Sequence, residues 1–172
     1  MAAQFASLFQ LKKERHQAEE ERLFLGFVVG DEAYAVEVGL IKEILRIPHI
    51  YSLPKVPSFV KGVIDLRGAI LPLMDLKERL GLGPVSLKKG RVVVMTPGNK
   101  PIGLLVDTVV EVFRTDLRDI KAPPDMFKQP HLQFIRGMVK IGEQLYLIMN
   151  PKLLLTPQEL SSLENHTWAP PG

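Results

Sequence analysis

Apolar and polar positions alternate with a period of two along most of the chain, which predicts short β-strands rather than long helices. "LFLGFVVGDEAYAVEV" (23–38) predicts two strands joined at 30–32, where a Gly-Asp-Glu run suits a tight turn. "RVVVMTPGNKPIGLLV" (91–106) and "FIRGMVKIGEQLYLIM" (134–149) predict two more hairpins in the same way. "TVVEVFRT" (108–115) predicts a further strand between them.

"VIDLRGAIL" (63–71) predicts another hairpin, with an arginine at its turn. Arg67 and Gly68 separate two apolar runs, and Asp65 lies two residues earlier. Gly68 can supply the positive φ that a two-residue turn needs. Two interpretations stay open for the charged pair. It either caps the turn and faces water, or it is presented to a partner.

Helix-capping patterns follow some of these strands. Asp75 with Glu78 three residues later resembles a capping box at the start of a short helix. Asn150 precedes a proline, which is typical of another short helix. Thr156 and Glu159 form a capping box that predicts a C-terminal helix.

Two segments near the N-terminus are less regular. Residues 2–22 lack Gly and Pro and are rich in Ala, Gln, Glu, Lys and Arg, which predicts a helix, docked on the body or on a partner. "GLIKEILRI" (39–47) fits either a helical turn or a strand.

The two halves of the chain repeat each other. Residues 60–80 align without a gap to 135–155 at an offset of 75, which matches Gly62 with Gly137 and the cap Asp75 with the cap Asn150. Upstream the offset is 68, and Glu43 matches Glu111.

The repeat predicts an all-β fold with short helices. It consists of two five-stranded small β-barrels packed around a shared core, because closing a sheet removes its edges. The body spans 23–158, divided into 23–85 and 86–158, and whether the barrels share strands stays open. A helical extension (1–22) and a C-terminal helix with a loose tail (159–172) flank it.

The repeat also separates scaffold positions from candidate functional ones. Asp65, Arg67 and Gly68 align with Lys140, Gly142 and Glu143, so the second copy builds its turn without an arginine. Arg67 is therefore a candidate partner contact, since its guanidinium offers five donors in a rigid fork. The alternative is a solvated turn residue.

Composition favours an ordinary globular domain. Of 172 residues 46% are hydrophobic, there is no cysteine, and the net charge is +3. Thiol chemistry and disulfides are thereby excluded. The chain lacks a secretion signal and an apolar run of membrane-spanning length, which predicts a cytoplasmic protein without direct membrane insertion. The basic clusters are Lys12, Lys13, Arg15 and Lys88, Lys89, Arg91, and they form no continuous stripe, so we expect no nucleic-acid partner. Nucleic-acid binding by a small barrel is the second hypothesis.

Catalytic and metal-binding patterns are missing from the sequence. Its four histidines are far apart, and no nucleophile elbow, phosphate loop or dinucleotide fingerprint occurs. We expect no enzyme activity, no metal and no cofactor. A hydrolase without a recognisable motif is the third hypothesis.

Two apolar segments follow the first hairpin of each half. "IKEILRIP" (41–48) and "VVEVFRTD" (109–116) occupy matching positions and would flank the seam between barrels. Ile41, Val109 and Phe113 belong either to the core or to a shallow apolar groove that suits an amphipathic helix of a partner.

The same residues carry a family resemblance. "AVEVGLIKEIL", "VPSFVKGVIDLRGAILPLMDLKERLGL", "PIGLLVDTVVEVF" and "FIRGMVKIGEQLYLIMNPKLLL" together resemble the CheW family of bacterial chemotaxis coupling proteins. The match covers about residues 22–158, and its most specific element is the string around Leu66-Arg67-Gly68.

This resemblance implies two barrels of the Src-homology-three type and no catalysis. It implies a scaffold that links a CheA-type histidine kinase to the cytoplasmic tip of chemoreceptors, recruited to receptor arrays. It places Ile41, Lys42 and Glu43 in a receptor-facing segment and Arg67 at or near a partner surface, where Glu43 is a possible partner of its guanidinium.

One position departs from the family pattern. Asp65 stands where the family usually has asparagine, and its carboxylate could hold Arg67 by a charge-assisted hydrogen bond. CheW-like adaptors also serve gliding, pilus and developmental pathways, so the pathway stays open.

Overall fold

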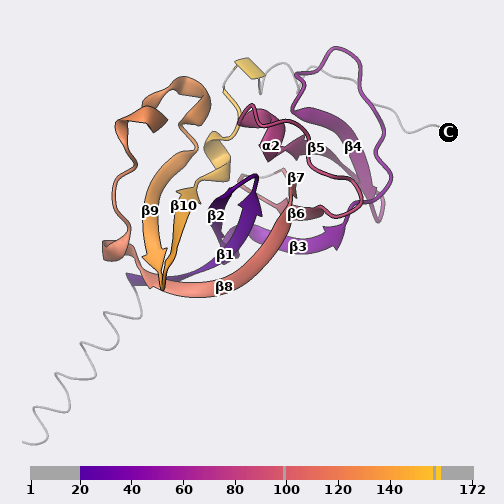
Figure 1. Ribbon diagram of the computed structural model, residues 1–172. Coiled ribbons are helices and arrows are strands. Elements are labelled where there is room, and N and C mark those ends of the chain that lie inside the picture. Colours follow the sequence, from indigo (N-terminus) through magenta and orange to yellow (C-terminus); the bar gives the residue numbers. More distant parts are fainter. Residues whose placement is uncertain (1–19, 99, 157, 160–172) are drawn as a thin grey trace, which may run out of the picture.

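The computed structural model describes residues 20–98, 100–156 and 158–159, and ten strands form two five-stranded sheets within this part of the chain (Figure 1). Sheet A consists of β1 (Glu21–Val29), β2 (Glu32–Glu37), β8 (Thr108–Asp116), β9 (Ile135–Ile141) and β10 (Gln144–Met149). Sheet B consists of β3 (Ile41–Arg46), β4 (Val60–Leu66), β5 (Ala69–Asp75), β6 (Arg91–Met95) and β7 (Ile102–Val106).

Each sheet takes strands from both halves of the chain. The order is β8-β1-β2-β10-β9 in sheet A and β3-β6-β7-β5-β4 in sheet B. If every strand is replaced by its counterpart in the repeat (β1 by β6, β2 by β7, and so on to β5 by β10), one order turns into the other. The repeat is therefore present in the fold, and the halves do share strands.

The strand irregularities repeat as well. The β3–β6 pairing shifts register between Ile41 and Glu43, which leaves Lys42 as the extra residue of a bulge. The β8–β1 pairing shifts at the equivalent place, and Val110 is the extra residue there. The bulges bend β3 and β8, which are edge strands of their sheets.

The prediction of two closed barrels is wrong. β8 and β9 form the two free edges of sheet A, and β3 and β4 those of sheet B. The connections between these strands occupy the edge instead: Tyr51 pairs with Val63 of β4, and Lys121 pairs with Met138 of β9. Each connection takes ladder hydrogen bonds that a closing strand would use, so the sheets curve but stay open.

A shared core joins the two sheets. Its buried members include Leu25, Phe27 and Leu147 of sheet A and Val93 and Leu104 of sheet B. Sheet A surrounds a smaller cluster built on Phe24, Phe113, Tyr146 and others, and sheet B surrounds one with Ile64, Leu71 and Val92. One face of each sheet thus builds the common core, and the other face lines its own interior.

The short helices follow their predicted caps. Helix α2 (Leu76–Arg79) begins after Asp75, whose side chain accepts from the backbone N–H of Glu78. The 3-10 helix η5 (Pro151–Leu153) begins after Asn150, which accepts from the N–H of Lys152. Four more 3-10 helices, η1 (Val38–Leu40), η2 (Leu117–Asp119), η3 (Asp125–Lys128) and η4 (Pro130–Leu132), lie in the described connections.

The terminal predictions have different outcomes. Glu21 and Arg22 belong to β1, because they pair with Asp116 and Thr115 of β8, so a helix extending to residue 22 is wrong. The rest of that predicted helix, residues 1–19, lies outside the described residues. Thr156 and Glu159 make the two reciprocal hydrogen bonds of the predicted capping box. Residues 160–172 also lie outside the described part.

Candidate partner-binding surface

The turn between β4 and β5 shows what Asp65 and Arg67 contact. Arg67 and Gly68 both have positive φ, 51° and 90°, as a two-residue type I′ turn requires. Asp65 Oδ1 accepts a 2.8 Å hydrogen bond from the N–H of Gly68, so Asp65 fixes the turn. No contact between Asp65 and the Arg67 guanidinium occurs within the described part of the chain. Arg67 Nη2 instead lies 2.8 Å from Glu43 Oε1.

The Glu43–Arg67 pair connects the two open edges of sheet B. Glu43 lies on β3, and Arg67 follows β4 at the opposite edge. The Arg67 side chain is 69% exposed, and exposed ion pairs stabilise proteins by about 0–1 kcal/mol at most. The pair therefore contributes little stability, but it presents a rigid donor fork beside an acidic group at the protein surface.

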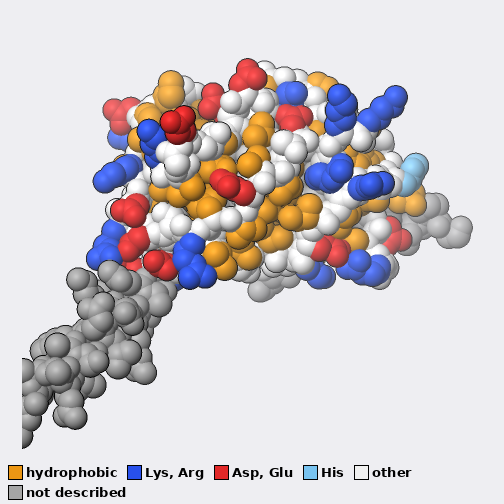
Figure 2. All heavy atoms as spheres, turned by 60° about the horizontal axis from the view of Figure 1, so that its bottom comes forward, with side chains coloured by type: hydrophobic (Ala, Val, Ile, Leu, Met, Phe, Trp, Pro, Cys, Tyr) orange, Lys and Arg blue, Asp and Glu red, His pale blue; other side chains and the backbone are white. Residues whose placement is uncertain are grey.

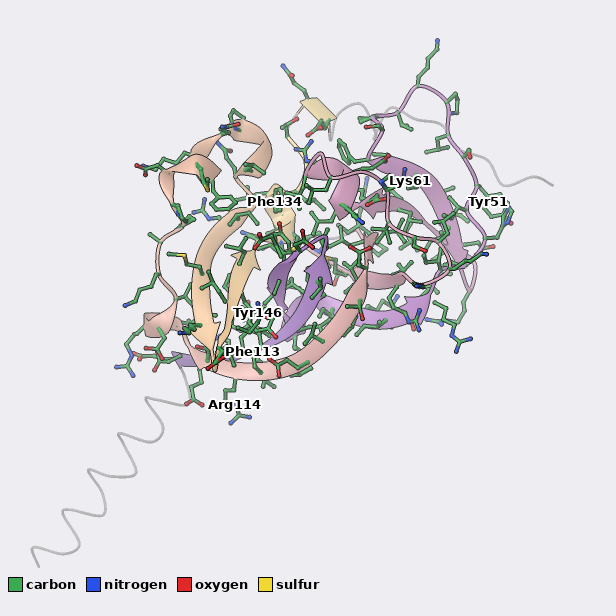
Figure 3. The ribbon with its side chains drawn as sticks, viewed as in Figure 1. Tyr51, Lys61, Phe113, Arg114, Phe134 and Tyr146 are labelled. Atoms are coloured by element: carbon green, nitrogen blue, oxygen red, sulfur yellow. The ribbon has the colours of Figure 1, made fainter. Side chains whose placement is uncertain are left out.

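Glu111, the repeat counterpart of Glu43, has a different partner. The Tyr146 hydroxyl donates to Glu111 Oε1 over 2.7 Å, and its ring packs against Phe113 with centroids 4.6 Å apart (Figure 3). Gly26 makes room for this ring, since a Cβ there would come within 2.5 Å of it. Burial and the Glu111 carboxylate raise the pKa of Tyr146 to about 12, so the hydroxyl stays protonated at neutral pH. Each of the two repeat glutamates therefore has a side-chain partner. The partner of Glu43 is a cation, Arg67, and the partner of Glu111 is a neutral hydroxyl, Tyr146.

The other predicted site residues divide between core and surface. Ile41 and Val109 are half-buried and pack against the shared core. Lys42 is exposed at the β3 bulge. Phe113 is buried inside sheet A between Phe24 and Tyr146, which removes it from the accessible surface.

Four exposed apolar side chains, which sequence reasoning missed, lie on β1, β3 and β8. They are Leu23, Ile44, Val110 and Val112, and each residue is between 41% and 57% exposed. We call these four residues the apolar strip. Figure 2 shows apolar side chains gathered in a continuous band on this face. Monomeric proteins seldom leave such bands uncovered unless they bind something.

The bulges explain why the apolar strip escaped notice. A strict period of two along β8 places Val109 and Phe113 on one face. The extra residue Val110 resets the alternation, so Phe113 pairs with Phe24 toward the interior of sheet A and Val112 pairs with Leu25. No signal in the sequence marks this bulge, since the equivalent bulge of β3 falls on a lysine, Lys42.

Surface hollows lie next to the apolar strip and at the open edge of sheet A. One of about 410 Å³ adjoins the strip and is lined by Leu23, Glu37, Gly39, Arg114 and neighbours. A larger one of about 630 Å³ lies at the open edge of sheet A, where acidic and basic side chains are mixed. Within the described ranges, no group of three or more histidine or acidic side chains could hold a metal ion. None of the helices in that part is long and apolar enough to cross a membrane.

The domain that carries this surface matches a known family. The family model of the CheW-like domain matches residues 23–159. This chain belongs to the CheW-like family. Residues 23–159 include both sheets, except for Glu21 and Arg22 of β1, together with the Leu66-Arg67-Gly68 turn and the apolar strip.

Relatives of known sequence cover most of the CheW-like region. "Chemotaxis protein CheW" of Rhizobium meliloti is 32% identical over 136 residues, which span 78% of this chain and 88% of that protein. "Protein PilI" of Pseudomonas aeruginosa is 35% identical over 139 residues, 78% of this chain and 75% of that protein. The crystal structure of the scaffolding protein TtCheW from Thermoanaerobacter tengcongensis has a TM-score of 0.72 and 28% identity, covering 80% of this chain and 94% of that chain.

Membership of the CheW-like family also fixes the class of activity. The chain is a non-catalytic adaptor of the CheW type. The prediction that it is not an enzyme is thereby confirmed, and the hydrolase hypothesis falls.

Proposed function

We propose that this adaptor couples the cytoplasmic tip of chemoreceptors to a CheA-type histidine kinase, and that it acts in the cytoplasm at receptor arrays. The observation that carries the proposal is the apolar strip beside the Glu43–Arg67 pair on a CheW-like fold. An adaptor needs two accessible surfaces, one for each partner.

The strip supports the receptor contact. A receptor tip is helical, and an amphipathic helix buries apolar side chains spaced three and four residues apart in an elongated apolar surface. Leu23, Val112 and Ile44 provide such a surface along three strands. Lys42 borders it at the β3 bulge and is available for an acidic side chain of the helix.

The open edge of sheet B supports the kinase contact. The CheW-like resemblance implies that the kinase's regulatory domain has a similar fold and pairs with one of the two sheet units of this chain. Arg67 projects from the β4–β5 turn with Gly68 beside it, so a planar guanidinium is available at the tip of a hairpin.

Pull-down with fragments of both partners tests the proposal. The parent chain should retain a receptor tip fragment and a CheA regulatory fragment from its own organism. Val112→Asp should reduce receptor capture at least tenfold, because a charge in an apolar contact costs about 2–4 kcal/mol. Met126→Asp is the matched control, since Met126 is 66% exposed and lies on η3, away from the strip. Failure of the parent to bind either fragment at micromolar concentration would contradict the proposal.

Arg67→Ala should weaken kinase capture by about tenfold while leaving the fold intact. Loss of a surface ion pair changes the unfolding free energy by no more than about 1 kcal/mol. A tenfold loss of affinity corresponds to about 1.4 kcal/mol, which is within the range for truncating an arginine at an interface. Thermal unfolding and the pull-down should be measured on the same preparation. A fall of many degrees in the melting temperature would assign Arg67 to the scaffold instead.

A motility, pilus or developmental pathway is the second candidate. PilI of Pseudomonas aeruginosa is 35% identical to this chain over 139 residues, and the Rhizobium protein named for chemotaxis is 32% identical over 136 residues. Pull-downs with receptor and kinase fragments from each such pathway of the organism would separate the two candidates.

A further inference from the structure

Two stretches of the chain contain basic residues and no acidic ones. No Asp or Glu occurs between Glu43 and Asp65, or between Glu78 and Asp107. The second stretch includes the cluster Lys88, Lys89 and Arg91, which neither the core nor the proposed function uses. The fold brings the two stretches together, because β3 ends in the first and β6 begins in the second.

Two arginines face each other where these strands pair. Arg46 of β3 is the direct cross-strand partner of Arg91 of β6. Side chains in this position lie about 5 Å apart on one face, and like charges there are destabilising. Arg91 Nη1 donates to the carbonyl oxygens of Gly90 and Lys89, at 2.9 and 3.3 Å, and neither contact neutralises the charge of the guanidinium.

Lys88 and Lys89 complete a group of four cations, which we call the basic corner. Both are exposed on the connection that leads into β6. Over the described ranges, no carboxylate lies within 4.0 Å of Arg46, Lys88, Lys89 or Arg91. Four charges of one sign without a counter-charge cost stability, which a bound anionic partner would recover.

The other sheet provides an internal comparison. The repeat matches Arg46 with Arg114 and Arg91 with Leu23, and these two are also cross-strand partners. There the second arginine is replaced by leucine, and Arg114 Nη1 lies 3.9 Å from Glu21 Oε2. The fold therefore does not need two arginines at this position, and only sheet B accumulates uncompensated charge.

The basic corner continues the apolar strip. Arg46 follows Ile44 by two residues on β3, beyond the bulge, so both side chains point to the same face. In Figure 2, Lys and Arg side chains gather on the right-hand side of the apolar band. A partner that lies along the strip therefore meets positive charge at the sheet B end.

The corner suits a carboxylate-rich protein segment better than other anions. Single-stranded nucleic acid is bound through exposed aromatic rings beside the basic groups, and every large hydrophobic side chain that is exposed in the described part is aliphatic. Two arginines directly opposite each other on paired strands can bind carboxylates through bidentate hydrogen bonds.

We infer that the basic corner recognises an acidic segment of the helical partner that covers the strip, and so fixes which way round that helix lies. This inference rests on the proposed adaptor function for the source of the segment. The charge recognition itself belongs to this chain and can be measured without either partner.

The direct experiment is fluorescence anisotropy with a labelled oligoglutamate peptide. The parent should bind the peptide at an ionic strength of about 0.01 M and bind on the order of tenfold more weakly at about 0.15 M. Lys88→Glu/Lys89→Glu and Arg46→Glu/Arg91→Glu should each lower the affinity at least tenfold. Lys140→Glu/Lys152→Glu makes the same charge change on exposed residues of β9 and η5 and should bind like the parent.

Several outcomes would overturn the inference. The parent could fail to bind the peptide, or both corner variants could bind it as tightly as the parent does. The control variant could lose as much affinity as the corner variants, or the parent could bind a single-stranded oligonucleotide of the same charge as tightly as the peptide. The loop variant Lys88→Glu/Lys89→Glu keeps the test valid if reversal of the partly buried Arg91 disturbs folding. If the parent fails to capture the receptor fragment but binds the peptide, the adaptor function is rejected and the charge recognition is not. Unchanged capture by the corner variants would reject the inference alone.

Discussion

Gly62→Val is expected to destabilise the protein severely. Gly62 has a φ of +138°, and a Cβ there would overlap the carbonyl oxygen of Tyr51 and lie 2.8 Å from its carbonyl carbon. The neighbour is backbone held by two hydrogen bonds between Tyr51 and Val63, so it cannot give way cheaply. The cost should reach about 4–5 kcal/mol, which is a large part of a typical stability of 5–15 kcal/mol.

Thermal and urea unfolding, with Gly98→Val as the control, check this prediction. A Cβ at Gly98 meets nothing within 4 Å, and its φ is ordinary. Gly137→Val should fall between the two, since its Cβ would lie 2.5 Å from a movable Ile120 methyl and 2.9 Å from the Lys121 carbonyl oxygen. A melting temperature for Gly62→Val within two or three degrees of the parent would contradict the expectation, because roughly 2–4 °C corresponds to only about 1 kcal/mol at this size.

Asp75→Ala should destabilise the fold by about 3 kcal/mol. Asp75 is fully buried, and its two oxygens accept from the N–H groups of Glu78 at 3.1 Å and Val85 at 2.9 Å. Truncation leaves both donors unpaired, and each unpaired buried group costs about 1–3 kcal/mol. Asn150→Ala is the matched control at the repeat position. It removes the acceptor of one exposed N–H, that of Lys152, which should cost about 1 kcal/mol. If the two variants lose the same free energy of unfolding, the hydrogen bond from Val85 to Asp75 adds no stability.

The pH dependence should also depend on Asp75. Burial raises the pKa of its carboxyl, and the two N–H donors and Lys61 only partly oppose that shift. The folded protein therefore holds the proton more tightly than the unfolded chain. This contribution to stability is complete below the ordinary pKa of 3.8 and is lost as pH rises through the raised value. In Asp75→Asn that part of the slope should disappear, and an unchanged slope would contradict the assignment.

The sequence predicted much of the fold because its strongest signals are local. Hairpins, the caps Asp75 and Asn150, and the Thr156–Glu159 capping box depend on residues close in the chain. The repeat added long-range information, since positions kept in both copies, such as Gly62 and Gly137, turned out to be points of close approach.

Other features depend on how distant segments meet, which periodicity does not reveal. The open sheets follow from the bridges at Tyr51 and Lys121, which have no pattern of their own. The exchange of strands between halves is compatible with the same hydrophobic pattern as two separate barrels. Within the site, Glu43 was a possible partner of the Arg67 guanidinium, and the two side chains do form an ion pair. The bulge at Val110 was not predicted, and it reverses the faces on which the later residues of β8 lie.

Strand exchange also governs how this protein is made. β1 leaves the ribosome first, yet its neighbour β8 is roughly ninety residues away in sequence, and β2 pairs with β10, about one hundred and ten residues away. Neither sheet can be completed from the first half alone, so a nascent first half exposes apolar strands until nearly the whole body has been synthesised. Folding dominated by such distant pairings is slow. We therefore expect the nascent chain to be prone to aggregation until β8 and β10 have been synthesised.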